Sequence, residues 1–374
     1  MPHRIASDTE AVEAARAFAA SVAGETGLRD RTRRLPADEI EALSQTGLLA
    51  ITVPRSHGGA GVSGATLAEV IATVAAADAS IGQIPQNHFY MLEAIRLDAT
   101  PARQVVWFDR VLDGARIGNA LAEFGTKTYT DFKTTILPDG DGFRVDGRKF
   151  YSTGALFAHW IAVVGKNQDG LRTIALAPRD APGLTLVDDW SSFGQRVTGS
   201  GTTILEGVRV PADALVPHHL AFARPTSMGP LAQIMHAAVD LGIARAGVAA
   251  ATAARTDDPA LVALAGRLVI ALHAADAMVA RAGRVVDRAA AEPTVTHVAE
   301  ASVAVAEAKI LTTEIALEAG NALFELRGPE AEAGLDRHWR DARTHTLHDP
   351  VRWKYHTIGN WVLNDRPPPR HGAI

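Results

Sequence analysis

The spacing of apolar residues changes twice along this chain of 374 residues. Residues 1–114 show the three- and four-residue period of amphipathic helices, residues 115–225 alternate in short runs, and residues 226–374 return to the helical period. Such a pattern predicts helices, then a sheet, then helices again. We therefore expect a mainly α-helical protein with an N-terminal helical domain (1–114), a central β-domain (115–225) and a C-terminal helical bundle with an extended tail (226–374).

The first zone predicts five helices. The first of them follows a capping residue, Ser7 or Asp8, and two later ones begin with proline, which is favoured in a first helical turn. Three helices are expected over residues 8–22, 65–77 and 101–112, and two more begin near residues 36 and 87.

Turn residues divide the middle zone into short strands. The segment PDGDG (138–142) precedes FRVDGRKFYST, and an Asp-Gly turn between alternating residues is typical of a β-hairpin. Further strands are expected over residues 160–164, 173–177, 184–187 and 202–205. Because no helical pattern separates these strands, we expect an antiparallel β-barrel or sandwich rather than a doubly wound α/β fold.

The last zone contains long amphipathic patterns joined by short connections. They cover residues 231–254, 259–290, 295–326 and 349–363. Long helices with short joints predict an antiparallel four-helix bundle. The tail PPPRHGAI cannot be helical, because proline lacks a backbone N–H group, so we expect it to be extended.

The composition excludes several classes of function. The chain has no cysteine, which rules out disulfides, zinc–cysteine sites, iron–sulfur clusters and a cysteine nucleophile. A formal net charge of −5 without a basic run argues against binding to nucleic acid or a membrane surface. The N-terminus has no signal-peptide pattern, and no uncharged stretch approaches the ~18 apolar residues of a membrane span. We expect a cytoplasmic protein.

One glycine-rich segment imitates a dinucleotide-binding site. Gly59, Gly61 and Gly64 fit the pattern G-x-G-x-x-G, between an apolar run and a predicted helix. The true fingerprint also requires a buried parallel strand after that helix, and ASIGQIPQNHFY is not such a strand. We interpret the segment as a structural loop.

Histidines are concentrated near the C-terminus, where five of the 14 fall within the last 37 residues. His345 and His348 are three residues apart, which places both imidazoles on one side of a helix. They could form a metal pair, an acid–base pair at a redox cofactor, or a surface pair without chemistry. A metal pair would need a third ligand such as Asp341 or Asp349, and we predict no metal site. His88 alone is more typical of a buried structural histidine.

Seven blocks of the sequence together resemble one known family. In order along nearly the whole chain, they are GLLAITVPRSHGGAGVS (47–63), ADASIGQIPQNHFY (77–90), GNALAEFGTKT (118–128), GRKFYSTGALFAHW (147–160), DDWSSFGQRVTGSGT (188–202), QIMHAAVDLGIARA (233–246) and LDRHWRDARTHTLHDPVRWKYHTIGNWVLN (335–364). They are similar to the acyl-CoA dehydrogenase superfamily, and more specifically to its flavin-dependent monooxygenase branch, which includes dibenzothiophene monooxygenase. The sulfur-acquisition oxidoreductases resemble the chain most closely.

The resemblance implies a flavin, FMN or alternatively FAD, held between the β-domain and the bundle. It places Asn119 beside the flavin ring, and it places Tyr151, Ser152 and Thr153 on a strand that meets the pyrimidine edge and N5. The segment at 247–261 is shorter than in the family, where it helps to bind the flavin phosphate. Arg255 is the residue of this segment that we expect to retain that contact.

The resemblance also implies the chemistry. His88, His345 and His348 match the histidines placed around the flavin, where they would assist oxygen transfer from a flavin C4a-hydroperoxide to a small organosulfur substrate. A separate NAD(P)H-dependent flavin reductase would supply the reduced flavin, and the superfamily's usual state implies a homotetramer. The alternatives are an N-hydroxylating or dehydrogenating flavoenzyme of the same fold and a flavin-free paralogue.

Overall fold

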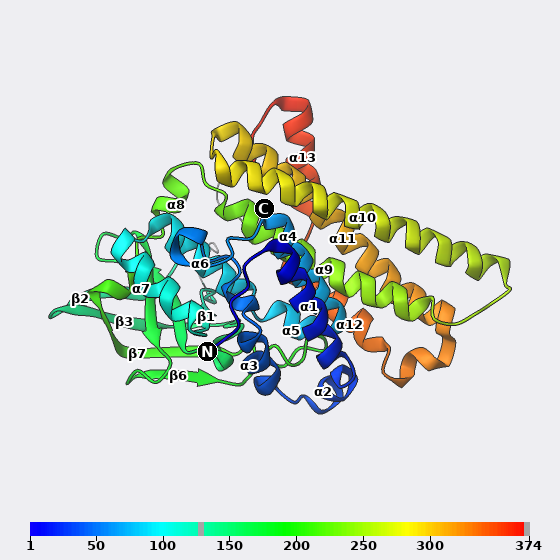
Figure 1. Ribbon diagram of the computed structural model, residues 1–374, viewed down its shortest axis with the longest axis horizontal. Helices are drawn as coiled ribbons and strands as arrows, with labels where there is room; N and C mark the ends of the chain where they lie inside the picture. The colour runs from blue at the N-terminus through cyan, green and yellow to red at the C-terminus, as the bar shows by residue number, and fades with distance from the viewer. Residues whose placement is uncertain (126–130, 370–374) are drawn as a thin grey trace.

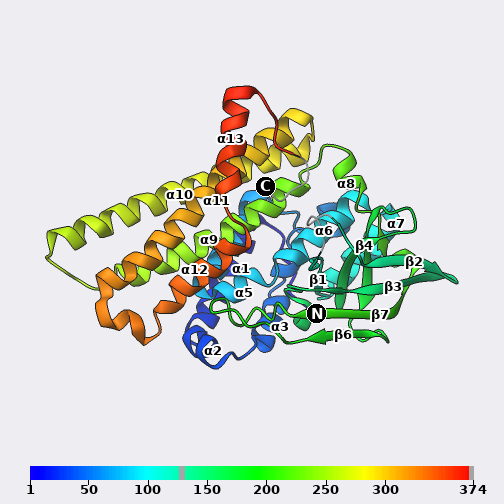
Figure 2. The ribbon, with the colours of Figure 1, turned by 180° about the vertical axis from the view of Figure 1, so that it is seen from behind.

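The computed structural model describes residues 1–125 and 131–369, and the side chains within them except those of Glu330, Glu332, Ala333 and His348. The N-terminal helices lie between a β-sheet on one side and a group of long helices on the other (Figure 1). The view from behind shows the same order, with the long helices extending away from the sheet (Figure 2).

The N-terminal helices follow the predicted pattern. Ser7 caps α1 by accepting a hydrogen bond from the backbone N–H of Glu10, and Ser63 caps α4 in the same way through Thr66. The five predicted helices are present, and two short ones, α2 and α5, are additional. Their bounds are α1 Asp8–Ala23, α2 Thr26–Thr32, α3 Ala37–Gln45, α4 Gly64–Ala77, α5 Ala79–Gln83, α6 Gln86–Asp98 and α7 Pro101–Leu112.

The glycine-rich segment is a structural loop, as predicted. The apolar run before it contains a 3-10 turn at Leu48–Ala50 and no strand, and a second 3-10 turn follows at Arg55–His57. A Cβ atom on Gly59 would lie 2.1 Å from the backbone oxygen of Val53, so the close approach of the chain to itself requires glycine there.

The sheet has eight strands in the described residues, and the predicted hairpin is formed by β2 and β3. The order is β6-β7-β3-β2-β4-β5-β8, and β1 pairs with β4 in parallel. The other neighbouring strands are antiparallel, as predicted, but β1 and, at Thr135, β2 pair with β4 in parallel, so the sheet is mixed. The long connections from β1 and β2 to β4 allow a parallel pairing that no tight turn could make. The strands are β1 Ile117–Ala120, β2 Thr135–Asp139, β3 Gly142–Lys149, β4 Trp160–Lys166, β5 Arg172–Pro178, β6 Leu184–Val187, β7 Thr202–Pro211 and β8 Leu215–Val216.

Five helices, rather than the four predicted, follow the short helix α8 (Leu220–Ala223) within the described chain. The unexpected helix is α12, whose sequence DRHWRDARTHTLH is mostly polar and so lacks the apolar stripe of the other bundle helices. Residues Pro367–Pro369 form no helix or strand, and the rest of the tail lies outside the described residues. The five helices are α9 Met228–Ala251, α10 Pro259–Ala291, α11 Val295–Arg327, α12 Asp336–His348 and α13 Arg352–Asn364.

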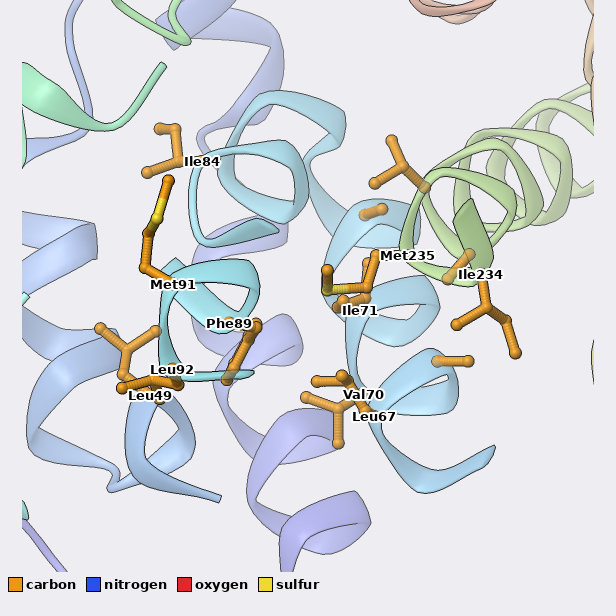
Figure 3. Packing of buried hydrophobic residues seen from close by; sticks show 14 of the residues in the cluster. Leu49, Leu67, Val70, Ile71, Ile84, Phe89, Met91, Leu92, Ile234 and Met235 are labelled. Atoms are coloured by element: carbon orange, nitrogen blue, oxygen red, sulfur yellow. The ribbon is translucent and has the colours of Figure 1, made fainter. Parts of the chain in front are cut away.

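The core is continuous between the N-terminal helices and the bundle. Figure 3 shows Leu67, Val70 and Ile71 of α4 on the side that faces Ile234 and Met235 of α9. A Cβ atom on Gly242 of α9 would lie 2.5 Å from the backbone oxygen of Ala72, so the two helix backbones nearly touch. This close packing fixes the position of α9, which lines the cavity described below.

Two helices, α9 and α10, are long and apolar enough to cross a membrane by length and composition alone. In α9, 72% of the apolar window is buried inside the fold, as in a core helix, whereas in α10 only 22% is buried. The outer face of α10 exposes apolar side chains, including Val262 and Ile270.

Candidate active site

A cavity of about 960 Å³ lies where the sheet, the N-terminal helices and the bundle meet. Its volume is at the upper end of the usual range for small-molecule and cofactor sites. The described residues that line it are Gln86, Asn87, Asn119, Leu121, Ala122, Phe124, Phe150, Tyr151, Thr153, Asp189, Trp190, Ser191, Ser192, Phe193, Ser200, Gly201, Thr202, Gln233, His236, Thr344, Leu347 and Asp349.

One edge of the cavity is backbone, held in an unusual conformation. Strand β3 ends at Lys149, so the predicted strand does not extend through Tyr151–Thr153. Tyr151 has a φ of 51°, which a residue with a side chain rarely adopts, and the N–H of Thr153 donates to the carbonyl of Tyr151 at 2.8 Å. Strain of this kind is typical of sites where the backbone itself meets a ligand.

Asn119, on β1, fixes this edge. Its Nδ2 donates to the carbonyl of Tyr151 at 3.2 Å, and its backbone N–H donates to the carbonyl of Thr153 at 3.2 Å. Its Oδ1 atom is buried and accepts no hydrogen bond from any residue that the structure describes. A buried carbonyl oxygen without a donor is costly, so this atom indicates a ligand with an N–H or O–H group.

The structure separates the three residues predicted after β3. Tyr151 and Thr153 line the cavity, and the hydroxyls of Thr153 and Ser200 are hydrogen-bonded at 2.7 Å. Ser152 is not among the lining residues, and its hydroxyl accepts a hydrogen bond from Thr203 at 2.8 Å. The hydroxyl of Ser152 is therefore directed toward β7 and away from the cavity.

Aromatic side chains form one wall of the cavity. The ring of Phe124 lies 4.1 Å from that of Phe150 and 5.4 Å from that of Tyr151, measured between centroids. The ring of Tyr151 lies 6.0 Å from that of Trp190, nearly perpendicular to it. A wall of this kind can hold a flat apolar molecule and exclude water from one side of it.

The bundle contributes polar groups to the opposite side. Asp349, directly after α12, accepts a hydrogen bond at 2.9 Å from the buried ammonium group of Lys354. Burial alone would raise the pKa of Asp349, but the nearby His236, Lys309 and Lys354 lower it, so the carboxylate is ionised. His236, on α9, lies beside it in the lining.

The three predicted catalytic histidines have different surroundings. His345 is fully buried and lies behind the lining, with its ring centroid 5.5 Å from that of His236. His348 is the last residue of α12, and its side chain lies outside the described part of the structure.

His88 is not among the described residues that line the cavity. Its Nε2 donates to the carbonyl of Leu49 at 2.8 Å, and its Nδ1 accepts from the backbone N–H of Ile117 at 3.1 Å. Burial lowers its pKa to about 4, so the imidazole is neutral. With both nitrogens hydrogen-bonded and no place in the described lining, His88 links α6 to the carbonyl of Leu49 and to β1.

Arg255 does not line the cavity of its own chain. It is exposed, and it lies in the turn between α9 and α10, at the end of the bundle that points away from the sheet (Figure 1). No Arg or Lys occurs among the described lining residues, so within these parts of the chain nothing neutralises a bound phosphate.

Two parts of the chain match models of one known protein family. Residues 6–115 match the acyl-CoA dehydrogenase N-terminal domain, and residues 234–353 match the acyl-CoA dehydrogenase C-terminal domain. A probable FMNH2-dependent monooxygenase, SfnC of Pseudomonas putida, is 31% identical over 96% of this chain and 96% of its own.

Two solved structures extend the likeness to the whole fold. FMN-bound TdsC, a dibenzothiophene monooxygenase of Paenibacillus sp. A11-2, has a TM-score of 0.91 and 31% identity, and the match covers 97% of this chain and 100% of TdsC. MsuC, a methanesulfinate monooxygenase of Pseudomonas fluorescens, has a TM-score of 0.87 and 30% identity, covering 96% and 97%.

This chain belongs to the acyl-CoA dehydrogenase family. Within the family it belongs to the flavin-dependent monooxygenase branch, and it is a flavin-dependent oxidoreductase. The predicted three-part fold is confirmed by these matches.

The residues present fit the FMN of this branch. The strained backbone edge, the free Oδ1 of Asn119 and the hydroxyls of Thr153 and Ser200 offer hydrogen-bonding groups to the edge of a flat heteroaromatic ring. The aromatic wall offers an apolar face beside that edge.

Sequence reasoning missed His236 and, apart from Tyr151, the aromatic wall, and it considered Asp349 only as a possible metal ligand. The sequence indicated these two residues only weakly: His236 is a polar residue in an otherwise apolar helical segment, and Asp349 directly precedes a proline that ends a helix. The aromatics gave no signal, because Phe124, Phe150 and Trp190 are far apart along the chain and only the fold brings them together.

Proposed function

We propose that this protein uses reduced FMN and O2 to transfer one oxygen atom to the sulfur of a small organosulfur compound. The observation that carries the proposal is the buried, unpartnered Oδ1 of Asn119 at a strained backbone edge, in a fold similar to FMN-bound TdsC. When bound, reduced FMN supplies the electrons that activate O2.

The chain's own residues would bind the flavin ring and orient it. Asn119, the Tyr151–Thr153 backbone and Ser200 would hold the polar edge of the ring, while Phe124 and Trp190 offer an apolar surface beside it. A dry site suppresses the loss of activated oxygen as hydrogen peroxide. The aromatic wall favours a flat apolar substrate such as a thiophene over a small ionic one.

The carboxylates of the described lining argue against a dehydrogenase. That reaction needs a carboxylate base with a raised proton affinity. Asp189 accepts hydrogen bonds from the N–H and the hydroxyl of Thr202, at 2.8 and 2.7 Å, and the pKa of Asp349 is lowered by its cationic neighbours. Neither carboxylate is suited to remove a carbon-bound proton.

The electrons would come from a separate NAD(P)H-dependent flavin reductase. The FMNH2 dependence of SfnC supports a two-component system, in which reduced flavin arrives from another protein. Because such a reductase uses the nicotinamide pool of the cell, we place the protein in the cytoplasm.

We also propose a homotetramer. The face of α10 that carries Val262 and Ile270 is exposed and apolar, as expected of a surface that packs against another copy. Arg255, at the far end of the bundle, is then available to the FMN phosphate of a neighbouring subunit. If so, Arg255→Ala weakens FMN binding in the assembled protein, and light scattering gives a mass four times that of one chain.

A reaction with a panel of substrates tests the proposed function. The purified protein receives photoreduced FMN and then air, together with dibenzothiophene, methanesulfinate, an aliphatic amine or an acyl-CoA. We expect oxygenation of a sulfur compound. Oxygenation of the amine or desaturation of the acyl-CoA would replace the proposal with one of the alternatives, and failure to bind FMN would show a flavin-free paralogue.

A further inference from the structure

Three pairs of polar residues, each four positions apart, meet inside the bundle behind the cavity. They are His236 and Asp240 on α9, Lys309 and Thr313 on α11, and His345 on α12 with Asp349 directly after it. The helices around them are rich in Ala and Val, where polar groups are costly unless they are paired.

Asp240 is the centre of this cluster. Its Oδ1 lies 2.5 Å from Nδ1 of His345, and its Oδ2 accepts hydrogen bonds from Nζ of Lys309 at 2.5 Å and from the hydroxyl of Thr313 at 2.6 Å. All four side chains are buried. Burial alone would raise the pKa of Asp240, but the charge of Lys309 and the contact with His345 lower it, so the carboxylate is ionised.

An ionised carboxylate fixes the tautomer of His345. Because it can only accept hydrogen bonds, the proton of the imidazole must be on Nδ1, and Nε2 is left to exchange a proton. Nε2 of His345 is buried and makes no hydrogen bond to any described residue. The ring lies 5.5 Å from that of His236, centroid to centroid, a separation that one hydrogen bond or one water molecule can bridge.

Of the two histidines, His236 lines the cavity together with Asp349, whereas His345 is not among the described lining residues. The charged groups around the two rings are Asp240 from α9, Lys309 from α11, Asp349 after α12 and Lys354 from α13. Asp240 is paired with Lys309, and Asp349 is paired with Lys354. Each carboxylate of the cluster therefore has a lysine partner, and the two imidazoles are the remaining acid–base groups.

We propose that Asp240 is a positioning residue that acts through His345, and that His236 exchanges protons with the contents of the cavity. We call Asp240, His345 and His236 the relay, and its role rests on the proposed function. When O2 and reduced FMN oxygenate sulfur, one oxygen atom forms the new S–O bond and the other leaves as water. The two hydrogens of that water come from reduced FMN, which is oxidised, so protons must be moved within the site.

The first test needs no flavin. In protein labelled with 15N-histidine, the signal absent from His345→Gln identifies His345, and its nitrogen shifts report the tautomer. We expect the Nδ1–H form in the wild type and its loss in Asp240→Asn, whose amide can donate to Nδ1. In Asp78→Asn, the matched control that changes another buried carboxylate, one paired with Arg29, the His345 signal stays in the Nδ1–H form. An unchanged tautomer in Asp240→Asn overturns the positioning role, even if the protein proves not to be an oxygenase.

The second test measures how much of the reduced FMN consumed yields oxygenated product and how much yields hydrogen peroxide. We expect Asp240→Asn and His236→Gln to shift this ratio toward peroxide by about tenfold, corresponding to ~1.4 kcal/mol, with FMN affinity retained, and Asp78→Asn to keep the wild-type ratio. A wild-type ratio in either of the first two variants overturns the relay. If Asp240→Asn does not fold because Lys309 is left as a buried charge, Asp240→Asn with Lys309→Met removes both charges and takes its place in both tests.

Discussion

The side-chain amide of Asn119 donates a hydrogen bond to the backbone carbonyl of Tyr151 at 3.2 Å and leaves its own Oδ1 buried without a donor. This contact joins β1 to the turn that follows β3, two segments separated by the β2–β3 hairpin. It holds the polar edge of the cavity in place and leaves one acceptor for a ligand.

Replacement of Asn119 by alanine should weaken FMN binding by about tenfold, because one hydrogen bond contributes roughly 1 kcal/mol and the turn at Tyr151 loses its support. Flavin fluorescence quenching measures this affinity. Ser152→Ala is the matched control: it removes the bond with Thr203 and lowers the free energy of unfolding by about 1 kcal/mol, while FMN affinity is retained. Equal loss of affinity in both variants would contradict the assignment.

Replacement of Trp190 by alanine should affect aromatic substrates most. The indole ring is part of the wall with Tyr151, and an aromatic contact adds roughly 1 kcal/mol beyond its buried area. We expect kcat/KM for dibenzothiophene to fall by about tenfold or more, and that for methanesulfinate to fall much less. A uniform loss for both compounds would show that Trp190 supports the fold and does not select the substrate.

His88 gives a prediction on stability against pH. Its folded-state pKa of about 4 lies below the ordinary value of 6.5, so between these values the unfolded chain binds the proton and the folded one does not. Stability from this group is present above pH 6.5 and is lost as the pH falls toward 4. At pH 5 the loss is about 2 kcal/mol.

Urea unfolding of the wild type and His88→Gln at pH 7.5 and pH 5 measures this effect. The stability advantage of the wild type should shrink by about 2 kcal/mol at pH 5, and the variant should oxygenate at the wild-type rate once folded. Loss of oxygenation in a folded, FMN-binding variant would show that His88 is a catalytic residue, as the resemblance implies.

The sequence predicted most elements of the fold, because their apolar residues have a clear period. It missed α12, whose residues are mostly polar, and the parallel pairing of β1, in which Ile117 pairs with Trp160, 43 residues further along the chain. In the site, Asn119, Tyr151 and Thr153 could be found by resemblance. Sequence alone could not show that the hydroxyl of Ser152 is directed toward Thr203, or that both nitrogens of His88 are hydrogen-bonded. Both features depend on contacts made only in the folded chain.

The central claim is that one atom of O2 is transferred to sulfur at this cavity with reduced FMN as the electron source. Its most direct test is mass spectrometry of the product formed from dibenzothiophene or methanesulfinate under 18O2, with reduced FMN supplied by a flavin reductase. Our account predicts one 18O atom per oxygenation event in the wild type and much less product in Asn119→Ala at the same FMN concentration. Product oxygen derived from water, or reduced FMN that yields only hydrogen peroxide with every sulfur compound, would contradict it.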